Sequence, residues 1–232
     1  MPKIPIQQYP RAIIWDFDGV IANTIPIHAE ATRYVLEKEN LTFDLQRMMT
    51  LIGRKDHEVF YTLVLDQKPD AAEEELRKLF QEKHHKYKDI LNHKKVPLYS
   101  GVKTWIYHFQ SKGLAQAIAS STSQENIHTV LSQSDLRSCF KTIVTGDSVA
   151  NGKPAPDIYL LASQRLEIKP ADCLVFEDST LGVVSAKRAN MRCFAICHTQ
   201  PAESLAEADE LLNSFEDYRP EDLFIDWGLG IQ

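Results

Sequence analysis

The sequence predicts an α/β protein: a Rossmann-like parallel sheet flanked by helices, with an inserted α-helical cap domain. Three observations lead to this prediction. Short apolar runs alternate with amphipathic segments through the second half of the chain, as in parallel sheets covered by helices. Polar residues follow several of these runs, where α/β folds place their chemistry. A long charged segment with helical periodicity interrupts the alternation after the first run.

The apolar runs have the length expected of buried strands and occupy residues 12–15, 116–119, 142–145, 174–176 and 193–197. The amphipathic segments between them predict helices over residues 102–112, 123–132, 156–164 and 180–189. Gly113 is expected to close the first of these helices. Near the end of the chain we expect an edge strand around Leu211 and a last helix around Pro220.

An insertion separates the first two strands. Asp18 and Ser120, which follow those strands, are 102 positions apart, far more than one strand-helix unit needs. The intervening segment has few glycines and carries helical apolar stripes, for example Val59, Phe60, Leu63 and Val64. We therefore expect a core formed by residues 1–22 and 95–232 and a helical cap formed by residues 23–94.

The composition limits the classes of partner. The net charge of −6 argues against nucleic acid, whose phosphates require a basic face. No apolar run approaches the roughly 18 residues that span a bilayer, and the first ten residues do not resemble a secretory signal. Four cysteines without a CxxC spacing suggest reduced thiols in a cytoplasmic protein: Cys139, Cys173, Cys193 and Cys197. We expect no membrane partner, and a monomer or weak homodimer.

Four polar signatures occur in a fixed order, each at or shortly after the end of an expected strand. They are Asp16-Phe17-Asp18-Gly19-Val20, Ser120, Lys153 within Gly-Lys-Pro-Ala-Pro-Asp, and Glu177-Asp178-Ser179. Because the carboxyl ends of parallel strands meet at one edge of a sheet, these side chains are expected to share a pocket.

These residue types suit magnesium-dependent phosphoryl transfer. Two like charges about 4 Å apart cost roughly 4 kcal/mol at an effective dielectric near 20, so a carboxylate pair beside a phosphate needs cations. Mg²⁺ on Asp16, Glu177 and Asp178, together with the Lys153 ammonium, would supply them.

The same residues predict a covalent route. Asp16 would attack phosphorus to give an aspartyl-phosphate, and Asp18 would act first as acid and then as base. Ser120 would donate a hydrogen bond to the transferring group. Backbone N–H groups after Asp16 and Ser120, including that of Ser121, would complete the anion cradle.

Each signature alone also has a purely structural explanation. An Asp-x-Asp at a strand end is common in turns. Thr122 with Glu125 fits a helix capping box, and Lys153 could be a solvated loop lysine. Glu177-Asp178-Ser179 could cap the following helix. Their joint order and spacing favour a single site.

As they stand, these motifs resemble the haloacid dehalogenase superfamily of phosphohydrolases, in the subclass with a helical cap between the first two motifs. The β-phosphoglucomutase-like and sugar-phosphatase branch is the most similar. The resemblance implies that Asp16 is the nucleophile and that Asp18 is the acid/base, with its backbone carbonyl on Mg²⁺. It also implies that Ser120 and Lys153 bind phosphate and that Asp178 binds the metal, with Glu177 beside it. An acid at position 18 argues against a dehalogenase or a phosphonoacetaldehyde hydrolase.

The cap departs from this pattern. Many relatives have Asp-Ser or Asp-Thr-Glu after the first motif, where this chain has residues 23–28, Asn-Thr-Ile-Pro-Ile-His. His28 is expected at the hinge. Arg54 or Lys55 would lie in a substrate-specificity loop and hold a distal anionic or hydroxyl group, a solvated turn being the alternative. Lys83 falls where the mutase keeps a cap phosphate ligand, although its charged neighbours favour a surface lysine.

The predicted function is Mg²⁺-dependent hydrolysis of a small phosphorylated metabolite, with a sugar phosphate as the expected class. The alternative is a β-phosphoglucomutase-type mutase, in which the cap excludes water and the phosphoryl group returns to sugar. A phospho-acceptor signalling module also gathers acids, a Ser or Thr and a Lys around Mg²⁺, but such modules have no lid. A catalytically idle binding protein is a further alternative. The expected partner is a small-molecule phosphate ester.

Overall fold

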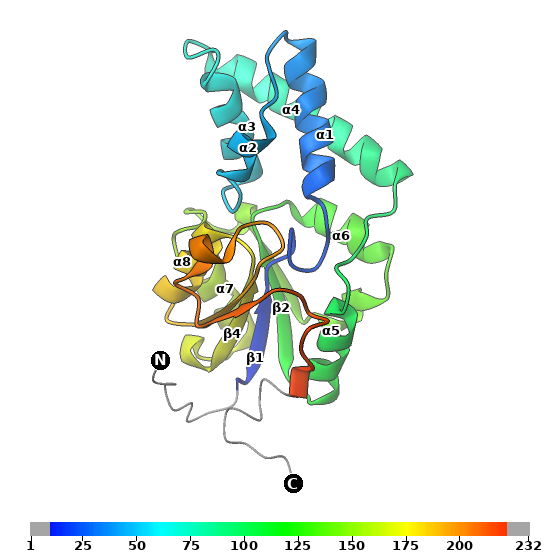
Figure 1. Cartoon of the computed structure of the whole chain (residues 1–232), viewed down its shortest axis with the longest axis vertical. Coiled ribbons are helices and arrows are strands. Elements are labelled where there is room, and N and C mark those ends of the chain that lie inside the picture. Colours follow the sequence, from blue (N-terminus) through cyan, green and yellow to red (C-terminus); the bar gives the residue numbers. More distant parts are fainter. Residues whose placement is uncertain (1–9, 222–232) are drawn as a thin grey trace.

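The computed structural model describes residues 10–221, and it shows a six-stranded parallel sheet with a group of four helices above one edge (Figure 1). The strand order is β3-β2-β1-β4-β5-β6. Their bounds are β1 Ala12–Trp15, β2 Ala115–Ser120, β3 Thr142–Thr145, β4 Cys173–Glu177, β5 Arg192–Ile196 and β6 Glu210–Leu212. The expected fold class is confirmed, and β6 is the edge strand expected near Leu211. The helix expected near Pro220 lies largely outside the described residues.

The first strand lies at the centre of the sheet. Trp15 of β1 is in register with Ile118 of β2 on one side and with Phe176 of β4 on the other. Because successive side chains of a strand alternate between faces, Ile13 and Trp15 enter one hydrophobic cluster, whereas Ala12 and Ile14 enter another. Because β1, β2 and β4 are parallel and in register, the residues that follow them leave the sheet at the same edge.

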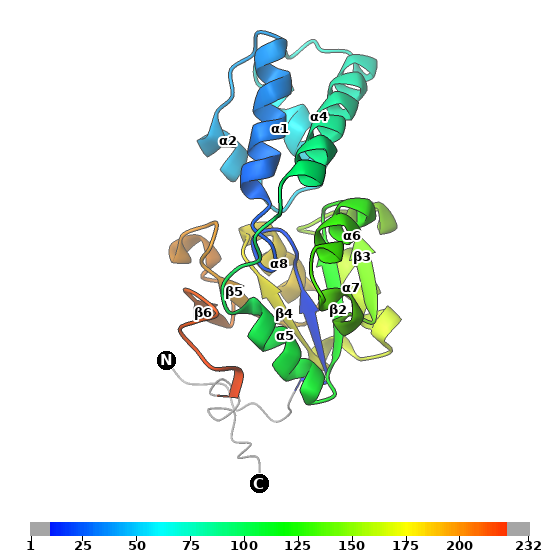
Figure 2. The same ribbon diagram turned by 90° about the vertical axis from the view of Figure 1, so that its right-hand side faces the viewer.

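Helices cover both faces of the sheet (Figure 2). The helices α5 Val102–Ser111 and α6 Gln124–Ser132 pack on the face of Trp15, while α7 Asp157–Leu166 and α8 Thr180–Arg188 pack on the other. Short 3₁₀ segments complete the connections: Leu136–Cys139, Gly146–Ser148, Pro170–Asp172 and Ala202–Leu205. Coverage on both faces explains why the strands are apolar runs rather than alternating patterns.

The start of α6 differs from the alternative in which Thr122 and Glu125 form a capping box. The cap is Ser123, whose hydroxyl accepts a hydrogen bond from the backbone N–H of Asn126 at 3.4 Å. Thr122 is buried, and its own backbone N–H donates to the Ser120 hydroxyl at 3.2 Å. The turn after β2 therefore extends one residue further before the helix begins.

The helices above the sheet, called here the cap helices, are α1 Ile25–Lys38, α2 Leu45–Met49, α3 Asp56–Leu65 and α4 Glu73–His93. They bury a hydrophobic cluster of their own around Val35, Leu36, Phe60, Leu63 and Val64. Helices α1 and α4 lie side by side and face the sheet end-on (Figures 1 and 2).

Two connections join the cap helices to the sheet, and they are hydrogen-bonded to each other. The backbone N–H of Asn23 donates to the carbonyl of Pro97 at 2.9 Å, and that of Tyr99 donates to the carbonyl of Ile21 at 3.0 Å. This paired hinge holds the cap helices over the carboxyl ends of the strands. A molecule bound at those strand ends would lie between the cap helices and the sheet.

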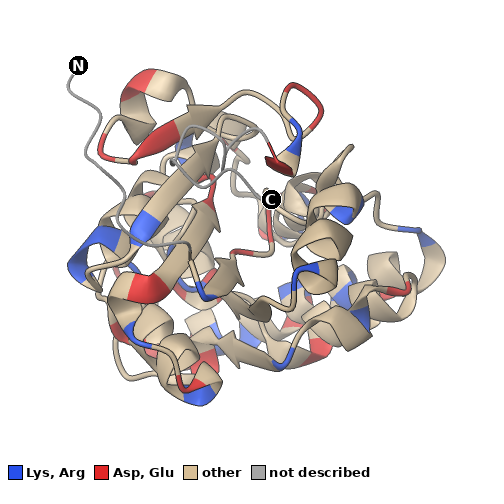
Figure 3. Ribbon diagram, turned by 90° about the horizontal axis from the view of Figure 1, so that it is seen from below, with Lys and Arg blue, Asp and Glu red and all other residues tan. Residues whose placement is uncertain are grey.

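The described part of the chain carries basic and acidic residues interspersed on most of its elements (Figure 3). Within residues 10–221, no helix has both the length and the apolar character needed to cross a bilayer. All four cysteines are free thiols, with Cys139, Cys173 and Cys193 buried and Cys197 half-buried.

Candidate active site

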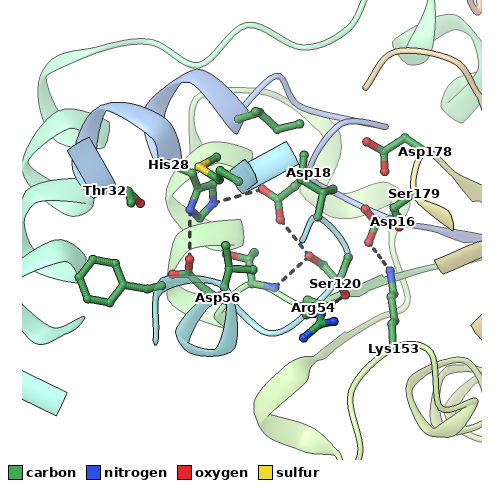
Figure 4. Close-up of a pocket in the computed structure, with 18 residues that line it drawn as sticks. Asp16, Asp18, His28, Thr32, Arg54, Asp56, Ser120, Lys153, Asp178 and Ser179 are labelled. Atoms are coloured by element: carbon green, nitrogen blue, oxygen red, sulfur yellow. Dashed lines mark hydrogen bonds and ion pairs between the residues drawn. The ribbon is translucent and has the colours of Figure 1, made fainter. Parts of the chain in front are cut away.

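Three carboxylates and one ammonium group meet at the carboxyl edge of the sheet. Figure 4 shows Asp16, Asp178 and Lys153 of this group. Lys153 Nζ donates to Asp16 Oδ1 at 2.7 Å and to Glu177 Oε1 at 2.5 Å. Asp178 completes the group, because one oxygen each from Asp16, Glu177 and Asp178 lies within 4.8 Å of the other two. The fold thus brings the first, third and fourth signatures together.

The charges of this group do not balance. Burial raises the pKa of Asp16 to about 8, opposed by Lys153 and reinforced by Glu177 and Asp18. Burial also raises the pKa of Asp178 well above its usual value, with Glu177 and Asp16 acting in the same direction. One ammonium group is insufficient to keep three buried carboxylates ionised, so the site favours an additional cation.

Asp178 has an oxygen free to bind such a cation. Its Oδ2 accepts a hydrogen bond from Thr199 Oγ1 at 2.6 Å, whereas its Oδ1 is buried and has no hydrogen-bond partner within residues 10–221. Gly19, at φ +87°, passes so close that a Cβ there would lie 1.8 Å from Asp178 Oδ2. A carboxylate-rich donor set with an unpartnered oxygen fits Mg²⁺, which prefers hard oxygen ligands.

Glu177 already has partners for both of its oxygens. Oε1 accepts from Lys153 and from the Tyr159 hydroxyl at 2.7 Å, and Oε2 accepts from the backbone N–H groups of Asp178 and Ser179 at 2.9 and 3.0 Å. Burial alone would raise the pKa of Glu177, but Lys153 and these hydrogen bonds hold it below its usual value. In this geometry Glu177 orients Lys153.

Asp18 lies at the cap side of the site and is held from two directions. Its Oδ2 accepts from Ser120 Oγ at 3.1 Å, and its Oδ1 accepts from Thr24 Oγ1 at 2.5 Å. Thr24 is fully buried at the hinge and precedes α1. The carboxyl group of Asp18 is therefore oriented jointly by the end of β2 and by the hinge. The signatures alone did not indicate Thr24.

The cleft between the sheet edge and the cap helices is lined by polar groups on the sheet side and largely by apolar groups on the cap side. Ser120, Ser121 and Lys153 line the sheet side. The cap side contributes Ile25, Met48, Ile52, Val59 and Phe60. Ser121 Oγ also donates to the carbonyl oxygen of Gly53 at 2.9 Å, which joins the two sides.

Of the two neighbouring basic residues in the expected specificity loop, only Arg54 lines this cleft. Lys55 instead reaches the core, where its Nζ donates to the carbonyl oxygens of Val149 and Ala150 at 3.1 and 3.4 Å. Its aliphatic stem covers Gly152, where an added Cβ would lie 3.0 Å from Lys55 Cγ. Lys55 therefore links the cap helices to the loop that carries Lys153.

The expectation that Lys83 is a surface lysine is wrong. Its side chain is 1% exposed and forms an ion pair with Asp56, and its Nζ lies 3.2 Å from His28 Nδ1. The physical reason is helical periodicity, because Lys83 belongs to the buried stripe of α4 formed by Leu76, Leu79, Lys83, Tyr87 and Ile90. That spacing was readable in the sequence and outweighs the charged neighbours.

His28 lies between Asp56 of this ion pair and Asp18 at the sheet edge (Figure 4). Its Nδ1 lies 3.4 Å from Asp56 Oδ1, and its Nε2 lies 3.9 Å from Asp18 Oδ1. His28 and Asp56 line the cleft, whereas Lys83 lies behind them. Although burial favours protonated Asp56, Lys83 and His28 hold the pKa of this carboxyl well below its usual value. Sequence reasoning missed Asp56.

A family model for haloacid dehalogenase-like hydrolases matches residues 13–196. The chain belongs to this family. It is 32% identical over 97% of its length to a bifunctional riboflavin kinase/FMN phosphatase from Arabidopsis thaliana, but spans only 57% of that protein. It is 34% identical to a phosphorylated carbohydrates phosphatase from Thermotoga maritima, with 88% of this chain and 97% of that protein covered.

Solved structures of the family show the same architecture. The crystal structure of CbbY from Rhodobacter sphaeroides in complex with phosphate superimposes with a TM-score of 0.79 at 28% identity, covering 89% of this chain and 95% of that one. The resemblance inferred from the motifs is thereby confirmed for the haloacid dehalogenase-like family.

Proposed function

We propose that this chain is a Mg²⁺-dependent phosphatase that hydrolyses a small phosphorylated metabolite through an aspartyl-phosphate. The observation that carries the proposal is the placement of Asp16, oriented by Lys153 beside the unpartnered oxygen of Asp178, at the floor of a cleft. The phosphatase relative from Thermotoga maritima, which matches 88% of this chain, supports the reaction class.

In the first half-reaction Asp16 attacks phosphorus. Its Oδ1 is engaged by Lys153, which leaves Oδ2 as the nucleophilic oxygen. Lys153 also offsets charge on the phosphoryl oxygens as the bond to the leaving oxygen breaks. Asp18, in its protonated form, donates its proton to that leaving oxygen. Ser120 and the backbone N–H of Ser121 hold the transferring group.

In the second half-reaction Asp18, now ionised, takes a proton from water, which attacks the phosphorus of the aspartyl-phosphate and releases phosphate. The P–O bond to Asp16 breaks and the carboxylate is restored. The hydrogen bond from Thr24 keeps Asp18 in place in both steps, while the Ser120 hydroxyl, which donates to Asp18 before substrate binds, turns to the transferring group.

Asp16, Asp178 and the backbone carbonyl of Asp18 would hold Mg²⁺. The ion would neutralise the carboxylates and the phosphoryl oxygens that approach them. Glu177, expected as a further ligand, acts in this proposal through Lys153, because both of its oxygens are engaged by other donors.

A sugar phosphate is the substrate class we propose, in keeping with the Thermotoga maritima relative. Arg54 lines the cleft, and no ion pair holds its guanidinium within residues 10–221, so it can bind an anionic or hydroxyl group of the substrate. His28 and Asp56 add a second polar position on the same side.

The oligomeric state and the cytoplasmic location stay predictions.

A panel of phosphate esters, assayed with Mg²⁺ and with a chelator, tests this proposal. Wild-type protein should release phosphate only with the metal, and Asp16→Asn should lower turnover at least about 10⁴-fold, as removal of other nucleophiles does. Turnover that survives this substitution would contradict the proposal. Isomerisation of a sugar 1-phosphate without net phosphate release would decide instead for the mutase.

A further inference from the structure

In the segment that follows β5, the side chains of His198 and Thr199 contact the candidate site, and the next side chain, that of Gln200, contacts the start of α8. His198 Nδ1 donates to the carbonyl oxygen of Gly19 at 3.0 Å, and Thr199 Oγ1 lies 2.6 Å from Asp178 Oδ2. Gln200 Oε1 accepts from the backbone N–H of Thr180 at 2.9 Å. The parallel pairing of β4 with β5 explains this placement, because both strands end at the same edge.

Thr199 fixes the orientation of the Asp178 carboxyl group. Its hydroxyl is also 2.9 Å from the backbone carbonyl oxygen of Asp178, so the single proton is shared between two acceptors on one residue. A carboxyl group held at Oδ2 cannot rotate freely, and the direction of Oδ1 is thereby set. Oδ1 is the buried oxygen that has no hydrogen-bond partner within the described range.

The loop after β1 is held against the same carboxyl group. The Thr199 methyl carbon Cγ2 would lie 2.9 Å from a Cβ added at Gly19, so this glycine packs between Thr199 and Asp178. His198, bonded to the Gly19 carbonyl, stacks on Tyr99 with ring centroids 3.8 Å apart. Residues 198 and 199 therefore hold both Gly19, in the loop after β1, and Asp178 in place.

We propose that Thr199 is a positioning residue for the divalent cation: its hydroxyl holds Asp178 so that Oδ1 faces the ion. The inference rests on the proposed function, since it takes Asp178 as a metal ligand. Partners of metal ligands commonly set metal affinity, and their loss costs 10–100-fold.

The test measures metal binding without substrate. Mg²⁺ binding is followed by calorimetry and Mn²⁺ binding by electron paramagnetic resonance for wild-type protein, Thr199→Val and Thr199→Ser. The valine variant keeps the shape and the methyl group but loses the hydroxyl, and we expect about 10–100-fold weaker binding. The serine variant keeps the hydroxyl and should stay within about threefold of wild type.

Thr180→Val is the matched control. It removes the hydrogen bond from the Thr180 hydroxyl to Gln200 of the same segment, and it leaves the contact with Asp178 intact. We expect its metal affinity to equal that of the wild type. Should Thr199→Val fail to fold, Thr199→Ala replaces it with the same expected loss.

Metal affinity of the valine variant within about twofold of wild type overturns the inference. An equal loss in Thr199→Val and Thr180→Val also overturns it, because the fold of the segment rather than the hydroxyl would then set the affinity. The proposed function fails separately, by absence of ester hydrolysis in wild-type protein that binds the metal normally.

Discussion

Two buried lysines, Lys153 at the sheet edge and Lys83 among the cap helices, show how charge balance separates a binding site from a structural ion pair. Their side chains are 2% and 1% exposed, and each contacts a carboxylate. Lys153 forms ion pairs with Asp16 and Glu177, in a group that also includes Asp178. Lys83 faces a single carboxylate, that of Asp56, with His28 beside it.

The group around Lys153 has excess negative charge, whereas the group around Lys83 does not. Burial holds the pKa of Asp16 and that of Asp178 above their usual values, whereas Lys83 and His28 outweigh burial and hold the pKa of Asp56 below its usual value. The group around Lys153 therefore favours an additional cation, which would also offset the charge of a phosphate bound beside it. The group around Lys83 is satisfied without a ligand, and it presents His28 and Asp56 to the cleft.

Of the substitutions at the two lysines, Lys153→Met is expected to have the larger effect. Turnover should fall about 10³-fold or more, because the charge that offsets the transferring phosphoryl group is lost. In a chelator the variant should also lose about 3–5 kcal/mol of unfolding free energy, since Asp16 and Glu177 stay buried at 9% and 0% exposure without a counterion.

Adding Mg²⁺ gives a second test of the Lys153→Met variant. Saturating Mg²⁺ should restore part of the lost stability of Lys153→Met, because the ion binds the folded carboxylates. Urea unfolding with and without the ion, alongside steady-state turnover, provides the measurement. Turnover within tenfold of wild type would show that the ammonium is dispensable and would remove the basis of the comparison.

Lys83→Met is expected to destabilise less, by about 2 kcal/mol, because its partner Asp56 is 22% exposed and partly solvated when left alone. Mg²⁺ should restore none of this loss. The double variant with Asp56→Asn should be more stable than the sum of the single changes predicts, since removing both charges leaves neither buried alone. Additive effects in this double-mutant cycle would mean that the two side chains are not energetically paired.

The sequence predicts the place of Lys153 in the site, but it did not lead us to the buried environment of Lys83. The difference has a physical reason. Lys153 lies in a short motif after a strand, and parallel strands bring such motifs to one edge. Lys83 lies on a long charged helix, where only its place in the apolar stripe reveals burial. Asp56 and Thr199 are defined by contacts with residues 27 and 21 positions away, which no local pattern encodes. Thr24 contacts Asp18 six positions earlier through an irregular turn, which has no helical or strand periodicity to reveal it.

The pH dependence of stability should have opposite signs in the two groups when metal is chelated. Asp16, with its folded-state pKa raised to about 8, binds more protons in the folded than in the unfolded protein between about pH 4 and that value. Its contribution to stability is therefore present at low pH and falls as the pH rises. Asp56, with its pKa lowered, contributes above about pH 4 and loses that contribution as the pH falls.

Asp16→Asn and Asp56→Asn are the matched variants for this test. In chelator, Asp16→Asn should gain stability relative to wild type as the pH rises from about 4 to 8. Asp56→Asn should lose stability relative to wild type as the pH rises from about 3 to 5. Urea unfolding across this range measures both. Parallel curves for the two variants would show that the groups do not differ in charge balance.

The smallest expected effect concerns Lys55, which connects the two regions. Its Nζ donates to the carbonyl oxygens of Val149 and Ala150, in the loop that leads to Lys153. A half-buried hydrogen bond of this kind contributes about 1 kcal/mol, so Lys55→Met should raise KM roughly fivefold by weakening the contact that holds the cap helices against the core. Because Lys55 does not line the cleft, kcat should change little.

Arg54→Met is the matched comparison for Lys55, since the neighbouring side chain lines the cleft. Its effect on KM should depend on the substrate, being larger for esters that carry a second anionic group. The effect of Lys55→Met on KM should be the same for every ester, because the contact between the cap helices and the core does not involve the substrate. A substrate-dependent effect at Lys55 would place its ammonium in the cleft and make it a ligand rather than a link between the cap helices and the core.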